Sequence, residues 1–273
     1  KYGLRAKDRK VYEFSSPDLG SFIHGILDKF ADTIRLNEMQ WSDITREWSR
    51  QTISELVDAE LSRQNNSILN SSSRYKYMTE RLKRILTRSV NIMTEHVKRS
   101  SFGTLANELA FGRGGELPAI KLSLPSGEEV QLIGRIDRVD ATDLESATYF
   151  RVIDYKTGQK SFSLSDVYFG LQLQLLVYLD ALLSNAHYYT ELQAMPGAVL
   201  YFRVDDPMIN GTADMTEEEI EKAILKKLKM NGLILKDARV VKSMDKEIEG
   251  YSLIIPARMN KGDTLGSTPS VVT

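Results

Sequence analysis

The chain contains no cysteine among its 273 residues. This absence excludes disulfide bonds, a cysteine nucleophile and thiolate metal ligands within the chain. An excess of one charge is also missing, because 36 Lys and Arg residues stand against 37 Asp and Glu residues, for a net charge of −1. A uniformly basic protein that coats nucleic acid is therefore excluded, and any contact with nucleic acid must come from a local patch.

Long apolar runs are lacking as well. The longest uncharged run in the middle of the chain, residues 167–179, is too short and too rich in glutamine to span a bilayer. No signal-peptide pattern opens the chain, so we expect a cytoplasmic protein with no membrane partner. Because the chain starts at Lys1 and not at a methionine, we expect it to be a fragment of a longer protein.

The chain does contain enough apolar sequence to build a core. Hydrophobic residues make up 42% and charged residues 27%, which is typical of a soluble globular protein. The length fits one large or two small domains. We predict a single α/β domain over residues 1–273, with a helical elaboration at 1–113, an α/β core at 114–210, and a C-terminal helix, strand and loose tail at 211–273.

The first 113 residues favour helices. Ser16-Pro17-Asp18 combines a cap residue with a proline at the first helical position, and apolar residues then recur at helical spacing as far as Phe30. Two more helices are expected, at 41–61 and 74–99, separated by an Asn/Ser-rich loop at 69–73.

The helix expected at 74–99 is basic. It carries eight Lys and Arg residues and only two acidic ones. Arg81, Arg84 and Arg88 are three and four residues apart, so they share one face of the helix. We interpret this face as a candidate surface for phosphates, the alternative being an ordinary solvated face.

A different pattern follows the glycine-rich segment 112–115. Alternating segments predict strands, and clusters of glycine and proline predict turns. Thr216 and Glu219 form a capping-box pattern at the start of a late helix. The tail from Met259 is rich in Gly, Ser and Thr and is expected to be loose. We expect strands at 119–124, 130–139, 148–157, 197–204 and 251–255, and helices at 163–184 and 216–232.

Two carboxylates lie on neighbouring strands of this set. If the strands that contain Asp137 and Asp154 form a symmetric hairpin, the turn centres between Glu145 and Ser146 and the two aspartates are cross-strand neighbours, with Cβ atoms ~5 Å apart. Like charges at this distance destabilise a sheet unless a cation lies between them. Hard oxygen ligands favour magnesium or manganese over zinc, so we predict such a metal site.

Lys156 adds an ammonium group to this pair. Side chains alternate along a strand, so Lys156 and Asp154 point to one face, while Ile153 and Tyr155 point to the other. Two carboxylates and one lysine suit phosphodiester hydrolysis: the metal polarises the phosphate and acidifies a water, and the lysine positions that water or neutralises developing charge. The alternative is an exposed cluster of salt bridges.

Three further polar residues lie on expected helices. Gln174 and Tyr178 are one turn apart, and a glutamine in an apolar run needs a hydrogen-bond partner if it is buried. His24 follows Gly20 by one turn on a largely apolar helix. The alternatives are a satisfied core glutamine and a structural histidine.

These elements occur in an order that belongs to a known family. The motifs are Gly20-x-x-x-His24, Gly134-x-x-Asp137-Arg138-x-Asp140, Asp154-x-Lys156-Thr157-Gly158 and Gln174-x-x-x-Tyr178. The chain thereby resembles RecB-type nucleases of the PD-(D/E)XK superfamily, over nearly its whole length. It is similar in particular to AddB-type nuclease domains, through Lys1-Tyr2-Gly3-Leu4, Glu108-Leu109-Ala110-Phe111-Gly112 and Gly170-Leu171-Gln172-Leu173-Gln174-Leu175.

The resemblance implies a restriction-endonuclease-like core, in which helices flank a mixed central sheet. It further implies that Asp137, Asp154 and the backbone carbonyl of Tyr155 bind the metal. His24 is similar to a histidine that contributes a further ligand or orients one.

The remaining motif residues also receive implied roles. Lys156 matches the catalytic lysine, and Gln174 and Tyr178 match residues that line the active site and contact the DNA strand. Glu108 and Asp140 match acidic positions whose role the resemblance leaves open.

The family further implies a function and partners. These are magnesium-dependent exonuclease cleavage of single-stranded DNA, inside a helicase–nuclease complex with an AddA-type helicase subunit, in double-strand-break repair and recombination. In that setting the basic helix could equally contact the neighbouring subunit. Two alternatives remain open: a catalytically inactive DNA- or subunit-docking module of the same fold, and a standalone exonuclease of the superfamily.

The chain departs from this family in lacking cysteine. AddB-type nucleases commonly hold an iron–sulfur cluster with four cysteines, one just before the position that matches Lys1 and three beyond the position that matches Thr273. We therefore expect the cluster in the longer protein and not in this chain.

Overall fold

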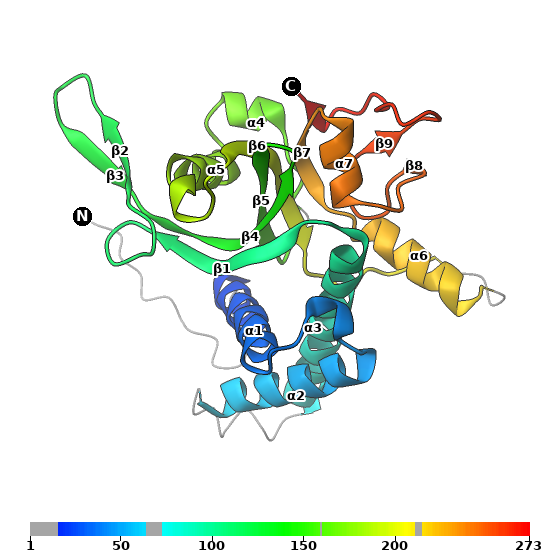
Figure 1. Cartoon of the computed structure of the whole chain (residues 1–273). Helices are drawn as coiled ribbons and strands as arrows, with labels where there is room; N and C mark the ends of the chain where they lie inside the picture. Colours follow the sequence, from blue (N-terminus) through cyan, green and yellow to red (C-terminus); the bar gives the residue numbers. More distant parts are fainter. Residues whose placement is uncertain (1–15, 64–72, 159, 211–214) are drawn as a thin grey trace.

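The computed structural model describes residues 16–63, 73–158, 160–210 and 215–273 (Figure 1). The Lys1–Leu4 motif and most of the loop expected at 69–73 lie outside these residues. A six-stranded mixed sheet forms the centre of the molecule, in the order β1-β4-β5-β6-β7-β10, and helices flank it. The predicted fold class is therefore confirmed.

The strands of the central sheet run both parallel and antiparallel. Antiparallel pairing joins β1 to β4, β4 to β5 and β6 to β7, whereas β5–β6 and β7–β10 are parallel. Two small two-stranded sheets, β2–β3 and β8–β9, stand apart from it. The strands are β1 (Gly103–Phe111), β2 (Ile120–Ser123), β3 (Glu129–Leu132), β4 (Gly134–Leu144), β5 (Ala147–Lys156), β6 (Gln193–Arg203), β7 (Asn231–Leu235), β8 (Gly250–Tyr251), β9 (Arg258–Met259) and β10 (Val271–Val272).

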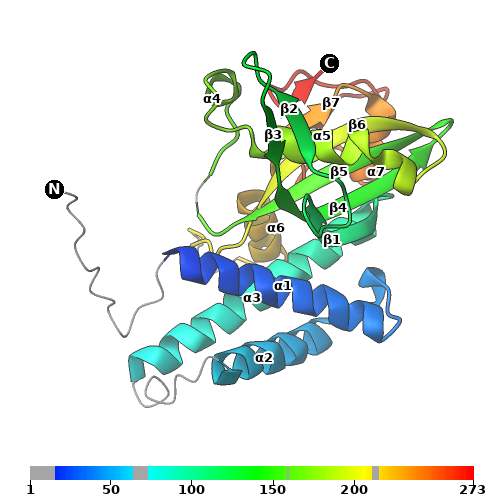
Figure 2. The same ribbon diagram turned by 90° about the vertical axis from the view of Figure 1, so that its left-hand side faces the viewer.

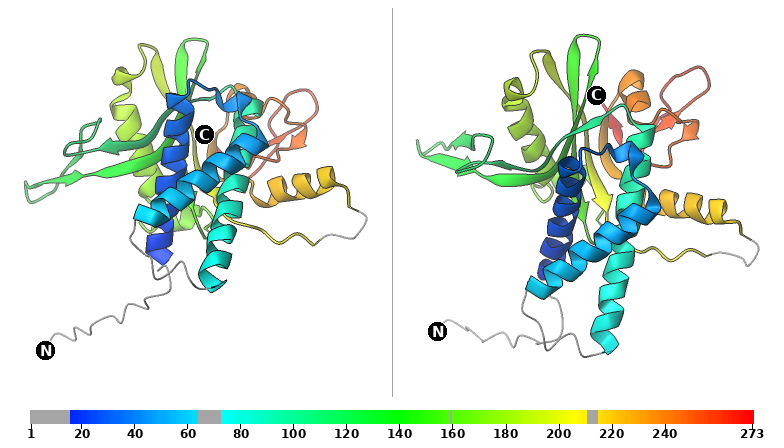
Figure 3. Two further views of the ribbon diagram at one scale, coloured as in Figure 1. Left: turned by 90° about the horizontal axis from the view of Figure 1, so that it is seen from below. Right: turned by 60° about the horizontal axis from the view of Figure 1, so that its bottom comes forward.

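Helices cover the two faces of the central sheet. On one face α1 and α3 lie against the sheet and α2 packs on both of them, and α5 packs against β4, β5 and β6 on the other face (Figures 1 and 3). The helices are α1 (Ser16–Leu36), α2 (Arg46–Arg63), α3 (Ser73–Arg99), α4 (Leu164–Tyr168), α5 (Gln174–Ser184), α6 (Glu217–Lys227) and α7 (Ala238–Met244), with 3-10 turns η1 (Trp41–Asp43) and η3 (Ala186–Tyr188). Within the described part of the chain, no helix is both long and apolar enough to cross a membrane.

Because both faces are covered, the central strands are apolar on both sides. On β5, Ile153 and Tyr155 belong to the core shared with α1–α3, whereas Val152 belongs to the core shared with α5. Leu200 and Val199 on β6 divide in the same way. The side-chain orientation predicted for Ile153 and Tyr155 is therefore confirmed.

The hairpin register inferred from the sequence is also confirmed. Arg138 pairs with Ile153 and Leu144 with Ala147, which leaves Glu145 and Ser146 as the turn. This is the register that sets Asp137 opposite Asp154. The ladder stops one pair short of the two aspartates, at the point where the candidate active site lies.

The single helix expected at 163–184 is wrong. It is divided into α4 and α5 by a turn in which Gly170 has a φ of +76°, a conformation that glycine adopts without steric cost. The Gln172 side chain holds the turn together by accepting from the Ser163 amide and donating to Asp166. The spacing of apolar residues does not reveal this interruption, because leucines continue through the turn.

The strand expected at 130–139 is likewise two strands. β3 ends at Leu132 and β4 begins at Gly134, so β3 pairs with β2 outside the central sheet while β4 pairs with β1. The strand expected at 251–255 is correct only at Tyr251, in β8.

The C-terminal part also differs from expectation. α6 has its capping box at Thr216 but ends at Lys227, and Gly232 lies inside β7, where an added Cβ would collide with the Val199 carbonyl oxygen. The tail is not loose at its end, since Val271 pairs with Ile234 of β7. The central sheet thus extends beyond residues 114–210, through β1 before them and β7 and β10 after them.

Candidate active site

The candidate site lies where β4 and β5 part. Beyond the Arg138–Ile153 pair, β4 stays paired with β1 and β5 stays paired with β6. In place of the ladder, the backbone amide of Tyr155 donates to Oδ2 of Asp137 over 2.6 Å. Asp137 and Asp154 are both buried, with 6% and 1% of their surface exposed. The strands therefore open around two carboxylates that are held away from solvent.

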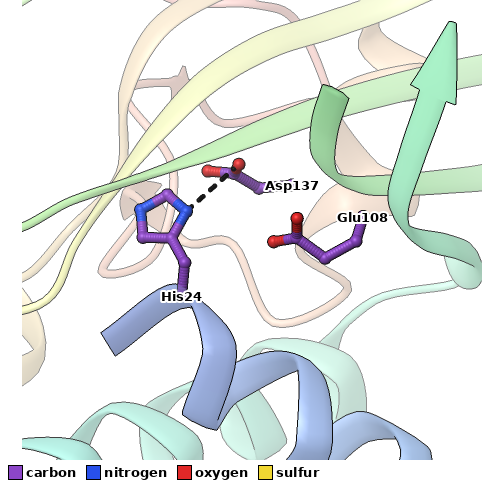
Figure 4. A group of neighbouring side chains, drawn as sticks. All are labelled: His24, Glu108 and Asp137. Carbon is purple, nitrogen blue, oxygen red and sulfur yellow. Dashed lines mark ion pairs between the residues drawn. The ribbon is translucent and has the colours of Figure 1, made fainter. Parts of the chain in front are cut away.

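His24 reaches this opening from α1 (Figure 4). Its Nδ1 is 3.3 Å from Oδ1 of Asp137, and its Nε2 is 3.0 Å from the carbonyl oxygen of Tyr155. Burial alone would lower the pKa of His24, but the hydrogen bond and charge of Asp137 outweigh burial and raise it. Both ring nitrogens of His24 therefore face oxygen atoms of the candidate site, and its role as a metal ligand stays a prediction.

Glu108 of β1 is the carboxylate that the sequence left unassigned. The β1–β4 register pairs Asn107 with Arg138 and Leu109 with Ile136, which sets Glu108 opposite Asp137. Its φ of +50° is uncommon for a residue with a side chain. Burial, followed by repulsion from Asp137, raises the pKa of Glu108 to about 7. The side chain points into the group formed by His24 and Asp137 (Figure 4).

A second set of contacts runs from Asp154 to α5. Lys156 forms an ion pair with Asp154 and donates to Oε1 of Gln174 over 3.3 Å, and Gln174 donates to the Tyr178 hydroxyl over 2.8 Å. Burial and then the charge of Asp137 raise the pKa of Asp154 to about 6, and Lys156 opposes this rise. Gln174 is exposed, so the core-glutamine alternative is wrong.

The glycine of the Gly134-x-x-Asp137 motif makes room for Tyr178. A Cβ at Gly134 would lie 2.7 Å from the Phe111 ring and 3.3 Å from the ring of Tyr178, and these two rings meet edge to face. Burial raises the pKa of the Tyr178 phenol above its usual range, so it stays neutral and can accept from Gln174. The motif glycine thus determines how closely α5 approaches β4.

The donor atoms present can accommodate a divalent cation. Ligand atoms of His24, Glu108 and Asp137 all lie within 4.8 Å of one another. A neutral imidazole has one donor, yet both nitrogens of His24 face oxygens, and a buried oxygen of Glu108 makes no hydrogen bond among the described residues. A bound cation would satisfy both features. The two carboxylates suit magnesium or manganese, whereas an imidazole nitrogen also suits transition metals such as zinc and iron.

Two of the four predicted ligands, Asp154 and the carbonyl of Tyr155, are not in this group of three, and metal binding by them stays a prediction. Asp154 is adjacent to the group but pairs with Lys156, and the carbonyl of Tyr155 accepts from His24. Glu108 takes a place that the sequence did not assign to it. The signal that could have found Glu108 was the β1–β4 register, which needed β1 to be recognised as a strand.

Asp140, the other unassigned acid, has a different position. It is fully buried between Arg138 (2.6 Å) and Arg151 (2.5 Å), and burial, which would raise its pKa, is outweighed by the two guanidinium groups, which lower it. Beside them, burial and the positive charge of Arg151 lower the pKa of His96 to about 3. Asp140 is therefore the shared counter-charge of two buried arginines behind the site.

The basic face of α3 is partly neutralised within the chain. Arg84 and Arg88 both pair with Asp206, which follows β6, while Arg81 is exposed. Two of the three arginines expected to bind phosphates therefore already have an acidic partner. Contact of this face with DNA stays a prediction.

A mixed sheet that opens around Asp137 and an Asp-x-Lys strand defines the class of the protein. The chain matches the PD-(D/E)XK nuclease superfamily over residues 1–255 and belongs to that superfamily.

Individual relatives narrow the comparison. The chain is 54% identical over 274 residues to an ATP-dependent helicase/deoxyribonuclease subunit from Clostridium perfringens (strain 13 / Type A), a match that covers 100% of this chain and 24% of the relative. It is 51% identical over 268 residues to the protein of the same name from Clostridium novyi (strain NT), covering 98% and 24%. It is 46% identical over 272 residues to the protein of the same name from Caldanaerobacter subterraneus subsp. tengcongensis, a match that covers 100% of this chain and 23% of the relative. The chain spans about a quarter of the length of these curated relatives.

Proposed function

We propose that this chain is a divalent-metal-dependent deoxyribonuclease domain that hydrolyses phosphodiester bonds of single-stranded DNA. The observation that carries the proposal is the meeting of two sets of groups where β4 and β5 part. One set is His24, Glu108 and Asp137, and the other is the contact chain from Asp154 through Lys156 to Gln174.

His24, Glu108 and Asp137 would hold the ion, with Asp154 beside them. When bound, a magnesium or manganese ion supplies positive charge that polarises the phosphate and eases deprotonation of the attacking water. The chain's own groups do the positioning. The Tyr155 amide fixes one oxygen of Asp137, and His24 faces the other.

Lys156 acts as the positive group on the other side. Asp154 and Gln174 hold its ammonium between them, so the charge is directed into the site before substrate arrives. A phosphate oxygen that gains negative charge during hydrolysis would be neutralised by this ammonium. Gln174 and Tyr178, joined by their own hydrogen bond, would then contact the DNA strand.

The setting of this activity is inferred from the relatives. Their shared name pairs a helicase with a deoxyribonuclease, and they are about four times as long as this chain. We propose that the chain acts in the cytoplasm on DNA strands exposed by an AddA-type helicase subunit, in double-strand-break repair and recombination. An iron–sulfur cluster would belong to the longer protein.

The test replaces Asp154 in the complete helicase–nuclease. Asp154→Asn should lower magnesium-dependent cleavage of single-stranded DNA by about 100-fold or more, while DNA unwinding persists. The control is Asp143→Asn, an exposed carboxylate on β4 that accepts from Thr148 outside the site. Unchanged cleavage by Asp154→Asn would refute the catalytic assignment and favour the inactive docking module.

Lys156→Ala separates the lysine from the metal ligands. It should reduce cleavage as Asp154→Asn does, yet retain magnesium binding in titration calorimetry, because its ammonium repels a cation. Loss of magnesium binding in this variant would contradict the role given to Lys156.

A further inference from the structure

The turn between α4 and α5 exposes two aromatic rings to solvent. Tyr168 is 85% exposed and Phe169 is 72% exposed, and Leu171 follows them at 74%. The rings of Tyr168 and Phe169 meet edge to face with centroids 5.2 Å apart. Burial of an aromatic side chain is favourable, and the fold leaves two successive aromatic side chains uncovered.

The turn is held in place by its own hydrogen bonds. Gln172 donates to the Ser161 carbonyl and to Asp166, and accepts from the Ser163 amide. The Leu171 amide donates to the Asp166 carbonyl over 2.7 Å. These hydrogen bonds fix the backbone of the turn that carries the two exposed rings.

This turn is continuous with the candidate active site. It ends at Leu173, and the next residue is Gln174, which accepts from Lys156. Two lysines are near the ends of the turn: Lys156 donates to Gln174, and Lys160 precedes Ser161, whose carbonyl accepts from Gln172. Both lysines stand over the ring of Tyr201. In Figure 2, α4 projects from the sheet above the N-terminal end of α1, the helix that carries His24.

We propose that Tyr168 and Phe169 form a stacking site for unpaired nucleobases of the DNA strand whose phosphates enter the active site. This inference rests on the proposed function and deepens it, because it gives the site a reason to favour single strands. Aromatic side chains stack on bases of any sequence, whereas bases in a duplex are already paired and stacked. The exposed rings would stack on the bases, and Lys156 and Lys160 would attract the phosphates. Both the bases and the backbone of a single strand would then have a partner.

The test compares two oligonucleotides that share phosphates but differ in bases. A dT oligomer and an abasic oligomer of equal length would be titrated against the complete protein, with calcium in place of magnesium and with strand integrity checked on a gel. The unsubstituted protein should bind the dT oligomer about tenfold more tightly, the effect expected for one stacked base.

The double variant Tyr168→Ala/Phe169→Ala should bind the dT oligomer about tenfold more weakly and the abasic oligomer unchanged. A second double variant, Tyr168→Leu/Phe169→Leu, keeps apolar area but loses the flat rings, and it should behave like the alanine variant. The control is Tyr188→Ala, which removes an aromatic ring that is 60% exposed beyond the other end of α5, and it should change neither affinity.

Three results would overturn the stacking site. They are equal losses for both oligomers, no loss for either, or loss of association with a helicase subunit while the preference for the dT oligomer persists. Magnesium-dependent cleavage by the unsubstituted protein tests the proposed function separately. If the unsubstituted protein cleaves DNA and the variants keep their preference for the dT oligomer, the stacking site alone is refuted. If the variants lose this preference and the unsubstituted protein does not cleave, the nuclease proposal alone is refuted.

Discussion

The Tyr155 backbone amide and the Asp137 side chain are joined by a hydrogen bond of 2.6 Å at the place where the β4–β5 ladder ends. A side chain of β4 thereby replaces a backbone partner for β5 and fixes its own carboxylate orientation. The carbonyl of the same Tyr155 accepts from His24 on α1. One residue of β5 thus links the first helix and the neighbouring strand to the candidate metal site.

The first prediction concerns charge and metal at Glu108. The folded state raises the pKa of Glu108 to about 7 and of Asp154 to about 6, above the ordinary range of carboxylic acids, so it binds these protons more tightly than the unfolded chain. Their contribution to the free energy of unfolding of the metal-free protein should therefore fall as pH rises from about 4 to 7. Magnesium should raise the melting temperature at pH 8 far more than at pH 5, where Glu108 is protonated.

Thermal unfolding in chelator and in magnesium, at both pH values, checks this expectation. Glu108→Gln should remove part of the pH-dependent loss and reduce the magnesium effect. Its control is Glu116→Gln, a carboxylate outside the group of His24, Glu108 and Asp137. A magnesium shift that is equal at pH 5 and pH 8 would contradict the assigned ligands.

The second prediction concerns the buried charges behind the site. Asp140→Asn leaves Arg138 and Arg151 without a compensating charge, and we expect it to lower the free energy of unfolding by about 3–5 kcal/mol. Asp143→Asn, on the same strand but exposed, should change it by about 0.5 kcal/mol or less. Urea unfolding of both variants measures the difference, and equal stabilities would show that Asp140 does not neutralise the two arginines.

The third prediction concerns the motif glycines. Gly134→Ala places a Cβ against the rings of Phe111 and Tyr178, so it should destabilise the fold by about 1–3 kcal/mol and reduce cleavage by displacing Tyr178. Gly20→Ala meets no atom within 4 Å inside α1 and should raise stability by about 0.5–1 kcal/mol. Denaturant unfolding and cleavage rates distinguish the two, and a neutral Gly134→Ala would mean that the close approach of α5 is not required.

The fourth prediction concerns the basic face of α3. If this face binds single-stranded DNA, Arg84→Ala/Arg88→Ala should weaken binding more at low than at high salt, and should reduce the slope of log affinity against log salt by about 1.4 for two lost phosphate contacts. Arg50→Ala, which removes an exposed arginine paired with Glu47 on α2, is the control. A salt response equal to that of the unsubstituted protein would assign both arginines to their ion pairs with Asp206 alone.

Much of the β4–β5 hairpin at the candidate site could be predicted because its information is local. Alternation along the two strands and a polar turn were enough to give the register that relates Asp137 to Asp154. The same alternation placed Lys156 on the side of Asp154. The helix break at Gly170 was missed because it depends on hydrogen bonds from Gln172, which apolar spacing does not report.

The sequence by itself determined which chemical groups are available: no thiols, balanced charge, and an Asp and Asp-x-Lys pair on adjoining strands. Only the tertiary structure decided which further acids belong to the site. Glu108 joins it because β1 pairs with β4 and sets that carboxylate opposite Asp137, a contact between strands separated by the β2–β3 hairpin. Asp140, three residues beyond Asp137 on the same strand, is instead enclosed by two buried guanidinium groups. Burial and the partners brought by other strands, which no local pattern encodes, separate a candidate ligand from a structural counter-charge.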